Sequence, residues 1–143
     1  MTRVFLIYDT KYGNTKIAAE KIAEGLREVE GTETAIDYVK NINLNELANY
    51  DALVIGAPNH MGKPSRTIMK FIDQLAKTRL KSKRIAVFDT YFKHERNYGK
   101  AMRKMEKTIT DNHVERCDLS KKQKAFRNKF KNDQREYKSS AQR

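Results

Sequence analysis

One loop near the N-terminus combines the groups that proteins use to hold a phosphate. Asp9–Thr15 follows a short apolar run and precedes a segment whose apolar residues recur at helical spacing. If a helix begins at this loop, its first backbone N–H groups and its dipole point at one small volume. Gly13 permits a positive φ and a close backbone approach to an anion. We interpret the loop as a phosphate-binding loop, with candidate residues Thr10, Lys11, Tyr12, Gly13, Asn14 and Thr15.

This loop differs from the common nucleotide-binding motifs. It contains a single glycine and lacks the Gly-Lys-Ser/Thr ending of the P-loop. The dinucleotide-binding pattern, with three spaced glycines, is also missing. The loop therefore favours one phosphate group over a triphosphate or a dinucleotide.

The segments around the loop alternate between strand and helix patterns. Continuous apolar runs, which are typical of strands covered on both faces, predict strands at residues 4–8, 35–39, 52–55 and 85–88. Helical spacing predicts helices on the apolar positions 17–29, 68–75 and 101–109, with a short helical turn near 44–47 and Pro64 in the first turn of the middle helix. This alternation predicts a doubly wound α/β fold, in which a parallel sheet lies between two helical layers.

In such a sheet the ligand binds at the carboxyl ends of the strands, where the strand order reverses. Two further loops lie at that edge, Ala57–Gly62 and Asp89–Tyr98. We expect these loops to complete the site that the first loop begins.

The first strand, loop and helix resemble the flavodoxin family. The residues that carry the resemblance are Leu6, Ile7, Tyr8, Thr10, Gly13, Thr15, Ala19 and Ile22, and the similarity extends with decreasing strength to about Ile109. The resemblance implies a three-layer fold with strand order 2-1-3-4-5. It also implies flavin mononucleotide (FMN) as the cofactor, with its phosphate on the first loop.

The resemblance assigns the other two loops to the isoalloxazine ring of FMN. It implies that Pro58, Asn59, His60, Met61 and Gly62 edge the ring, with His60 and Met61 in place of the aromatic residue of many flavodoxins. Gly62 could permit a peptide flip on reduction. The third loop is expected to supply one aromatic side chain that stacks on the outer face of the ring. Tyr91 is the preferred candidate, and Phe92 and Tyr98 are the alternatives. Thr90 of the same loop is also a candidate site residue. A stacked phenol would lower the second reduction potential.

The chain offers few groups for catalysis by its own side chains. His60, His94 and His113 are far apart, and the single cysteine, Cys117, can form neither an internal disulfide nor a cysteine-based metal site. No hydrolytic triad is apparent. The sequence favours a non-enzymatic electron carrier, and an FMN-dependent NAD(P)H:quinone reductase is the alternative within the redox class.

The C-terminal part differs in composition from the rest of the chain. Residues 1–115 carry 20 Lys and Arg against 15 Asp and Glu, whereas residues 116–143 carry 10 against 3. We therefore divide the 143 residues into an FMN-binding domain, 1–115, and a basic segment, 116–143. Residues 113–119 are a weak candidate for the fifth strand, so the segment is a degenerate last β–α unit, a disordered tail or an altered chain end.

Charge also bears on partners. Flavodoxins are typically acidic, but this body is basic, and Lys63, Arg66, Lys70 and Lys93 lie near the proposed ring edge. We expect acidic redox partners, such as iron–sulfur or ferredoxin-like proteins.

A missing fifth strand would leave the fourth strand as an exposed edge of the sheet, through which the chain could form a homodimer. The basic segment raises the alternative of a nucleic-acid or acidic-surface binding module, although no nucleic-acid motif is present. No apolar run reaches membrane-spanning length, so we expect a cytoplasmic protein without a membrane partner.

Overall fold

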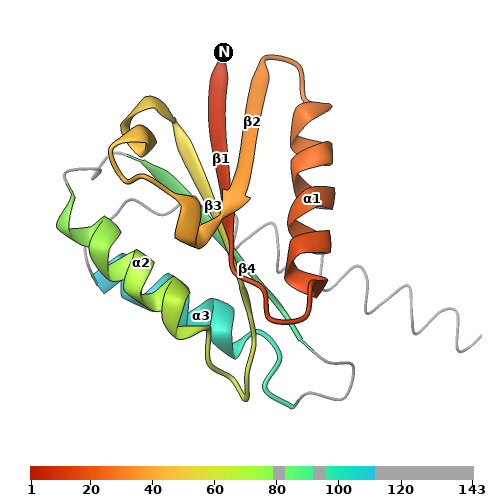
Figure 1. Cartoon of the computed structure of the whole chain (residues 1–143), viewed down its shortest axis with the longest axis vertical. Coiled ribbons are helices and arrows are strands. Elements are labelled where there is room, and N and C mark those ends of the chain that lie inside the picture. Colours follow the sequence, from red (N-terminus) through yellow and green to blue (C-terminus); the bar gives the residue numbers. More distant parts are fainter. Residues whose placement is uncertain (79–82, 92–95, 112–143) are drawn as a thin grey trace, which may run out of the picture.

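The computed structural model of the chain describes residues 1–78, 83–91 and 96–111. Its elements alternate along the chain (Figure 1): β1 (Thr2–Tyr8), α1 (Asn14–Arg27), β2 (Thr32–Tyr38), the 3₁₀ turns η1 (Val39–Asn41) and η2 (Glu46–Asn49), β3 (Ala52–Pro58), α2 (Arg66–Lys77), β4 (Arg84–Thr90) and α3 (Lys100–Asp111). The strands form one sheet in the order β2-β1-β3-β4. All three pairings are parallel, which confirms the predicted doubly wound fold.

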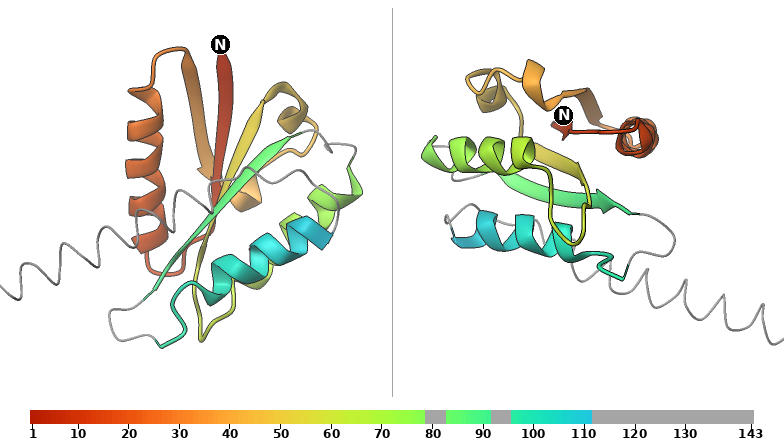
Figure 2. Two further views of the ribbon diagram at one scale, coloured as in Figure 1. Left: turned by 180° about the vertical axis from the view of Figure 1, so that it is seen from behind. Right: turned by 60° about the horizontal axis from the view of Figure 1, so that its bottom comes forward.

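The helices cover the sheet from two sides (Figure 2). The larger core lies between the sheet and the pair α2 and α3, where Ile7, Leu53 and Ile55 meet Ile72 and Met105. The smaller core lies on the α1 side and is built on Leu6, Tyr8, Ala19 and Ala23. Successive residues of a strand point to opposite faces, so the continuous apolar runs of β1 and β3 supply both cores.

The buried face of α1 differs from the predicted one. We expected Ile17 and Val29 among its apolar positions, but both side chains are exposed, and Val29 lies beyond the end of the helix. The fully covered residues are Thr15, Ala19 and Ala23. Small side chains let the helix lie close to the sheet, where the larger Leu6 and Tyr8 fill the space between the layers.

Every strand is longer than its apolar run. The second strand was predicted at 35–39 but spans Thr32–Tyr38, because its polar first residues pair with the start of β1. The third and fourth strands continue to Pro58 and Thr90, which pair with each other. Backbone pairing extends these strands past the point where hydrophobicity stops. Pro58 and Thr90 are therefore strand ends and not loop residues.

Helix α2 begins at Arg66, two residues after Pro64, and so later than expected. Ser65 is its N-cap, and the Ser65 hydroxyl accepts a hydrogen bond from the Ile68 N–H group at 3.3 Å. Pro64 is buried just outside the helix.

Gly56 on β3 allows an aromatic ring to cross the sheet surface. A Cβ atom at this position would lie 2.1 Å from Cζ of Phe88 on the neighbouring strand. Only a residue without a side chain leaves room for the Phe88 ring, which packs against the α1-side core.

Some of the predictions fall outside the described residues. These include the candidate fifth strand at 113–119 and the boundary of the basic segment at 116. Among the helices of the described residues, none is both long and apolar enough to cross a membrane.

We predict that Gly56→Ala destabilises the fold, because the new methyl group would overlap the Phe88 ring. The free energy of unfolding should fall by about 1–3 kcal/mol, measured by urea denaturation. Gly25→Ala is the matched control: this helical glycine has open space around it, and the substitution should stabilise by about 0.5–1 kcal/mol. Equal effects of both substitutions would contradict the overlap.

Candidate functional site

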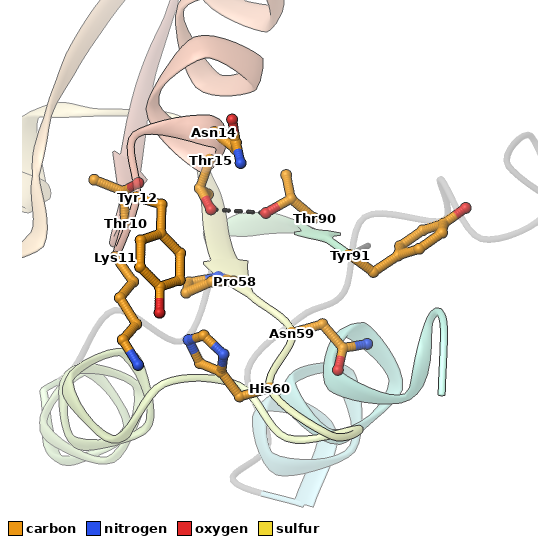
Figure 3. Close-up of a pocket in the computed structure, with 10 residues that line it drawn as sticks. All are labelled: Thr10, Lys11, Tyr12, Asn14, Thr15, Pro58, Asn59, His60, Thr90 and Tyr91. Atoms are coloured by element: carbon orange, nitrogen blue, oxygen red, sulfur yellow. Dashed lines mark hydrogen bonds between the residues drawn. The ribbon is translucent and has the colours of Figure 1, made fainter. Parts of the chain in front are cut away.

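A pocket of about 380 Å³ lies where the carboxyl ends of β1, β3 and β4 meet. This volume includes space that is open to solvent. Figure 3 shows side chains from all three strand ends around it. The lining residues are Thr10, Lys11, Tyr12, Asn14, Thr15, Pro58, Asn59, His60, Thr90 and Tyr91. The tertiary structure thus brings the three proposed loops together.

The first loop leaves the N-terminus of α1 open to the pocket. Gly13 is the N-cap, with a φ of 90°, and no side chain caps the helix. The first N–H groups of a helix have no carbonyl partner within it. By contrast, Ser65 occupies that position at α2. The uncapped end of α1 therefore presents backbone donors and a positive dipole end to an anion.

Two threonine hydroxyls shape this end of the pocket. The Thr10 hydroxyl accepts a hydrogen bond from the Gly13 N–H at 2.8 Å, which closes the loop. Thr15 is almost fully buried, and its Oγ1 lies 2.7 Å from Oγ1 of Thr90 at the end of β4. Either hydroxyl can donate in this pair. The bond ties the start of α1 to a strand that lies far away in the sequence.

Asp9 is a buried carboxylate at the base of the first loop. Its Oδ1 accepts a hydrogen bond from the Thr10 N–H at 2.9 Å. Burial of the Tyr38 phenol, together with the charge of Asp9 and a hydrogen bond to it, raises the pKa of Tyr38 above its usual range. Asp9 orders the loop from beneath and does not line the pocket.

The second loop is a tight hairpin turn. His60 and Lys63 exchange two backbone hydrogen bonds, of 2.9 and 3.0 Å. Between them, Met61 has a φ of 52° and Gly62 a φ of 86°. His60 lines the pocket, whereas the Met61 side chain is 83% exposed and neither Met61 nor Gly62 reaches the lining.

Aromatic side chains stand at the rim of the pocket. Tyr91 lines it, and in Figure 3 its ring points away from the middle of the pocket. The ring lies beside that of Tyr98, with centroids 5.7 Å apart, and both rings are partly exposed. Tyr12, which is 69% exposed, lies on the opposite side with the Lys11 ammonium 5.3 Å from its ring centroid. Phe92 falls outside the described residues.

Asn59 connects residues that the sequence did not single out. It is 3% exposed, and its Nδ2 donates hydrogen bonds to Oδ2 of Asp89 at 3.2 Å and to the Asn97 carbonyl at 2.8 Å. Asp89 and Asn97 were absent from the candidate list. A carboxylate at the end of a strand was the available signal for Asp89, but nothing local marks Asn97.

Among the described residues, no group of three or more His, Cys, Asp or Glu side chains could hold a metal ion. The pocket instead combines backbone N–H groups, hydroxyls, amides and aromatic rings. This set suits an organic anion with a flat ring system.

Comparisons with solved structures show which known proteins share this fold. A flavodoxin from the domain Archaea matches with a TM-score of 0.71 over 82% of this chain and 79% of its own, at 21% identity. Rubredoxin oxygen:oxidoreductase from Desulfovibrio gigas matches with a TM-score of 0.68 over 80% of this chain, but over 28% of its own length and at 18% identity. At these identities the matches establish a shared fold.

Sequence comparisons extend this result. A flavodoxin from Aquifex aeolicus (strain VF5) is 40% identical over 75 residues, which span 52% of this chain and 40% of the length of that relative. A family model described as a flavodoxin domain matches residues 5–132, which is most of the chain. Fold, pocket and sequence agree, and this chain belongs to the flavodoxin family.

Proposed function

We propose that this chain is an FMN-dependent electron-transfer protein. Proteins of the flavodoxin family bind FMN, and the family match covers all three loops of the pocket. When bound, FMN supplies reversible one- and two-electron chemistry. The chain itself binds the cofactor, orients it and limits the access of water. The observation that carries the proposal is one pocket at the strand ends that joins an uncapped helix N-terminus to a partly apolar rim.

The phosphate end of the pocket fits FMN. The open N-terminus of α1 and the hydroxyls of Thr10 and Thr15 provide neutral donors for a phosphate. The Asn14 amide lines the same part of the pocket. Preorganised dipoles hold an anion without the entropy loss of an arginine side chain, and this loop has no arginine.

The other end of the pocket fits a flat ring. Pro58 and His60 form one wall, and Tyr12 and Tyr91 offer aromatic faces near the opening. Met61 and Gly62 follow His60 at the tip of the hairpin and lie outside the lining. We propose that the backbone of this turn faces the edge of the isoalloxazine ring.

The proposed function predicts that the purified chain retains FMN. The chain is mixed with excess FMN and desalted, and its visible spectrum and released flavin are measured. One FMN per chain is expected. A folded chain that keeps no FMN would refute the proposed function.

Thr15→Val tests the phosphate end in the same assay, because it keeps the volume of the side chain and removes its hydroxyl. The Kd for FMN should rise about tenfold, the loss of roughly one hydrogen bond to a charged group. Thr110→Val is the control, since its hydroxyl bonds only its own helix, to the Glu106 carbonyl at 2.8 Å, at the far end of α3.

Tyr91 is the residue that we propose to stack on the flavin. Its exposed side chain can turn toward the pocket by rotation about χ1, a low-cost change at the surface. A phenol face against the ring disfavours added negative charge. Tyr91→Ala should therefore raise the second reduction potential of bound FMN, measured by spectroelectrochemistry. Tyr98→Ala is the comparison, and a larger shift there would assign the stacking to Tyr98.

The surface around the pocket indicates the charge of the partner. Three segments contain, follow or contact residues that line the pocket, and each carries basic side chains but no Asp or Glu. Segments 10–16, 61–70 and 96–104 contain two, three and four Lys or Arg residues, respectively. Arg66 and Lys70 on α2 are exposed. We propose acidic redox proteins as partners, such as small iron–sulfur proteins, since opposite charges steer association.

Salt should slow electron transfer between the FMN-loaded chain and an acidic [2Fe–2S] protein. We expect at least about a tenfold fall in the second-order rate between low salt and roughly 0.3 M, because that salt shortens the Debye length below about 10 Å. Arg66→Glu/Lys70→Glu should mimic the effect, and Lys77→Glu at the other end of α2 should not. If the rate with basic cytochrome c fell in the same way, the acidic-partner proposal would be wrong.

Other functions remain alternatives with simple tests. Steady NAD(P)H oxidation with a quinone acceptor would favour the reductase. Within the described residues β4 pairs only with β3, so the other edge of β4 is available for pairing. We propose that two copies of the chain associate through this edge, and a monomeric mass at micromolar concentration would refute the homodimer. The basic segment 116–143 lies outside the described residues, and salt-sensitive oligonucleotide retention that is lost on its deletion would support the binding module.

A further inference from the structure

The polar atoms of the Asn59 side chain form hydrogen bonds with three different segments. Its Nδ2 donates to Asp89 at the end of β4 and to the carbonyl of Asn97, which precedes α3. Its Oδ1 accepts a hydrogen bond from the Gly62 N–H at 2.8 Å. The backbone N–H of Asn59 donates to the Thr90 carbonyl at 2.8 Å. One buried residue therefore joins the hairpin turn, the last strand and the start of the last helix.

The turn that Asn59 contacts has a conformation that its own sequence does not favour. Met61 and Gly62 both have positive φ values, as in a type I′ turn. Asn-Gly is the preferred pair there, and methionine is disfavoured because its Cβ crowds the backbone. The bond from Gly62 to Asn59 fixes the orientation of the Met61–Gly62 peptide group. The turn therefore depends on support from outside itself.

The same turn packs directly on the start of α3. A Cβ atom on Gly62 would lie 3.1 Å from Cδ of Lys100 and 3.3 Å from Cβ of Asn97. Asp89, which accepts from Asn59, also accepts a hydrogen bond from the Met102 N–H in the first turn of α3, at 3.2 Å. The turn and the helix are thus held together both by close packing and by a shared carboxylate.

We propose that Asn59 is a positioning residue that clamps the 60–63 turn to Asp89 and to the start of α3, and so sets the ring-side wall of the pocket before the cofactor binds. The part of this inference that concerns FMN rests on the proposed function. A wall that is already ordered binds its ligand without a further loss of conformational entropy.

The first test uses the chain without added FMN. Asn59→Ala should speed hydrogen exchange of the Gly62 amide at least about tenfold, measured by NMR, because it removes that amide's acceptor. The amide of Ile55 in the core of β3 should exchange as in the unsubstituted chain. Asn45→Ala, at an exposed asparagine, is the control and should change neither amide.

The second test exchanges the donor and the acceptor. Asn59→Asp keeps an acceptor for Gly62 but sets a carboxylate against Asp89, so the Kd for FMN should rise about tenfold. Asn59→Asp/Asp89→Asn removes the repulsion between the two carboxylates, while the carboxylate at position 59 still faces the Asn97 carbonyl, so part of the lost FMN affinity should be recovered. Neither substitution changes the size of a side chain, so Asn59→Asp and the double variant test the clamp even if Asn59→Ala fails to fold.

The outcomes separate this inference from the proposed function. Unchanged Gly62 exchange in Asn59→Ala, or a double variant no better than Asn59→Asp, would overturn the clamp. If the chain binds no FMN at all, the proposed function fails, while Gly62 exchange in Asn59→Ala still decides whether Asn59 holds the turn.

Discussion

The parallel pairing of β1 with both β2 and β3 is the constraint on which the rest of this structure depends. Since the chain winds outward from β1 in both directions, the loops after β1 and β3 separate at one edge of the sheet and leave a crevice. Every parallel strand ends at that same edge, so β4 adds a third loop to it. The pocket follows from topology before any single side chain is considered, and the side chains decide what it can hold.

Small residues and buried polar bonds then set the distances within this frame. Ala19 and Ala23 let α1 approach the sheet, which brings the helix N-terminus over the strand ends. Thr15 and Thr90 join the start of α1 to the end of β4, and Asn59 with Asp89 joins the second loop to the same end of β4. The first two loops are thus tied to one strand end through the buried side chains of Thr15 and Asn59. Hydrogen bonds in such surroundings are costly to leave unmade, so they hold the loops in one arrangement.

The electrostatics of the site operate at two ranges. At short range, the first N–H groups of α1 and the hydroxyls of Thr10 and Thr15 lie at the proposed phosphate position, and the Asp9 carboxylate is directed into its own loop. At longer range, the bordering segments are uniformly basic. Because fixed dipoles can hold an anion in such a site, the basic side chains around it remain solvated and available to contact a partner protein.

The sequence by itself determined the alternation of strands and helices and the first loop, because these depend on neighbours within a few residues: the apolar run of β1, Gly13 and the helix that follows. The parallel sheet was inferred from the alternation, since a crossover helix joins parallel strands. The sequence missed the buried face of α1, since periodicity marks Ile17 as readily as Ala19, and only the fit against Leu6 and Tyr8 selects between them. It also missed the roles of Asp89 and Asn97, which lie 30 and 38 positions from Asn59. Hydrogen bonds across such separations have no local signature, so only the tertiary structure decided how the loops are held.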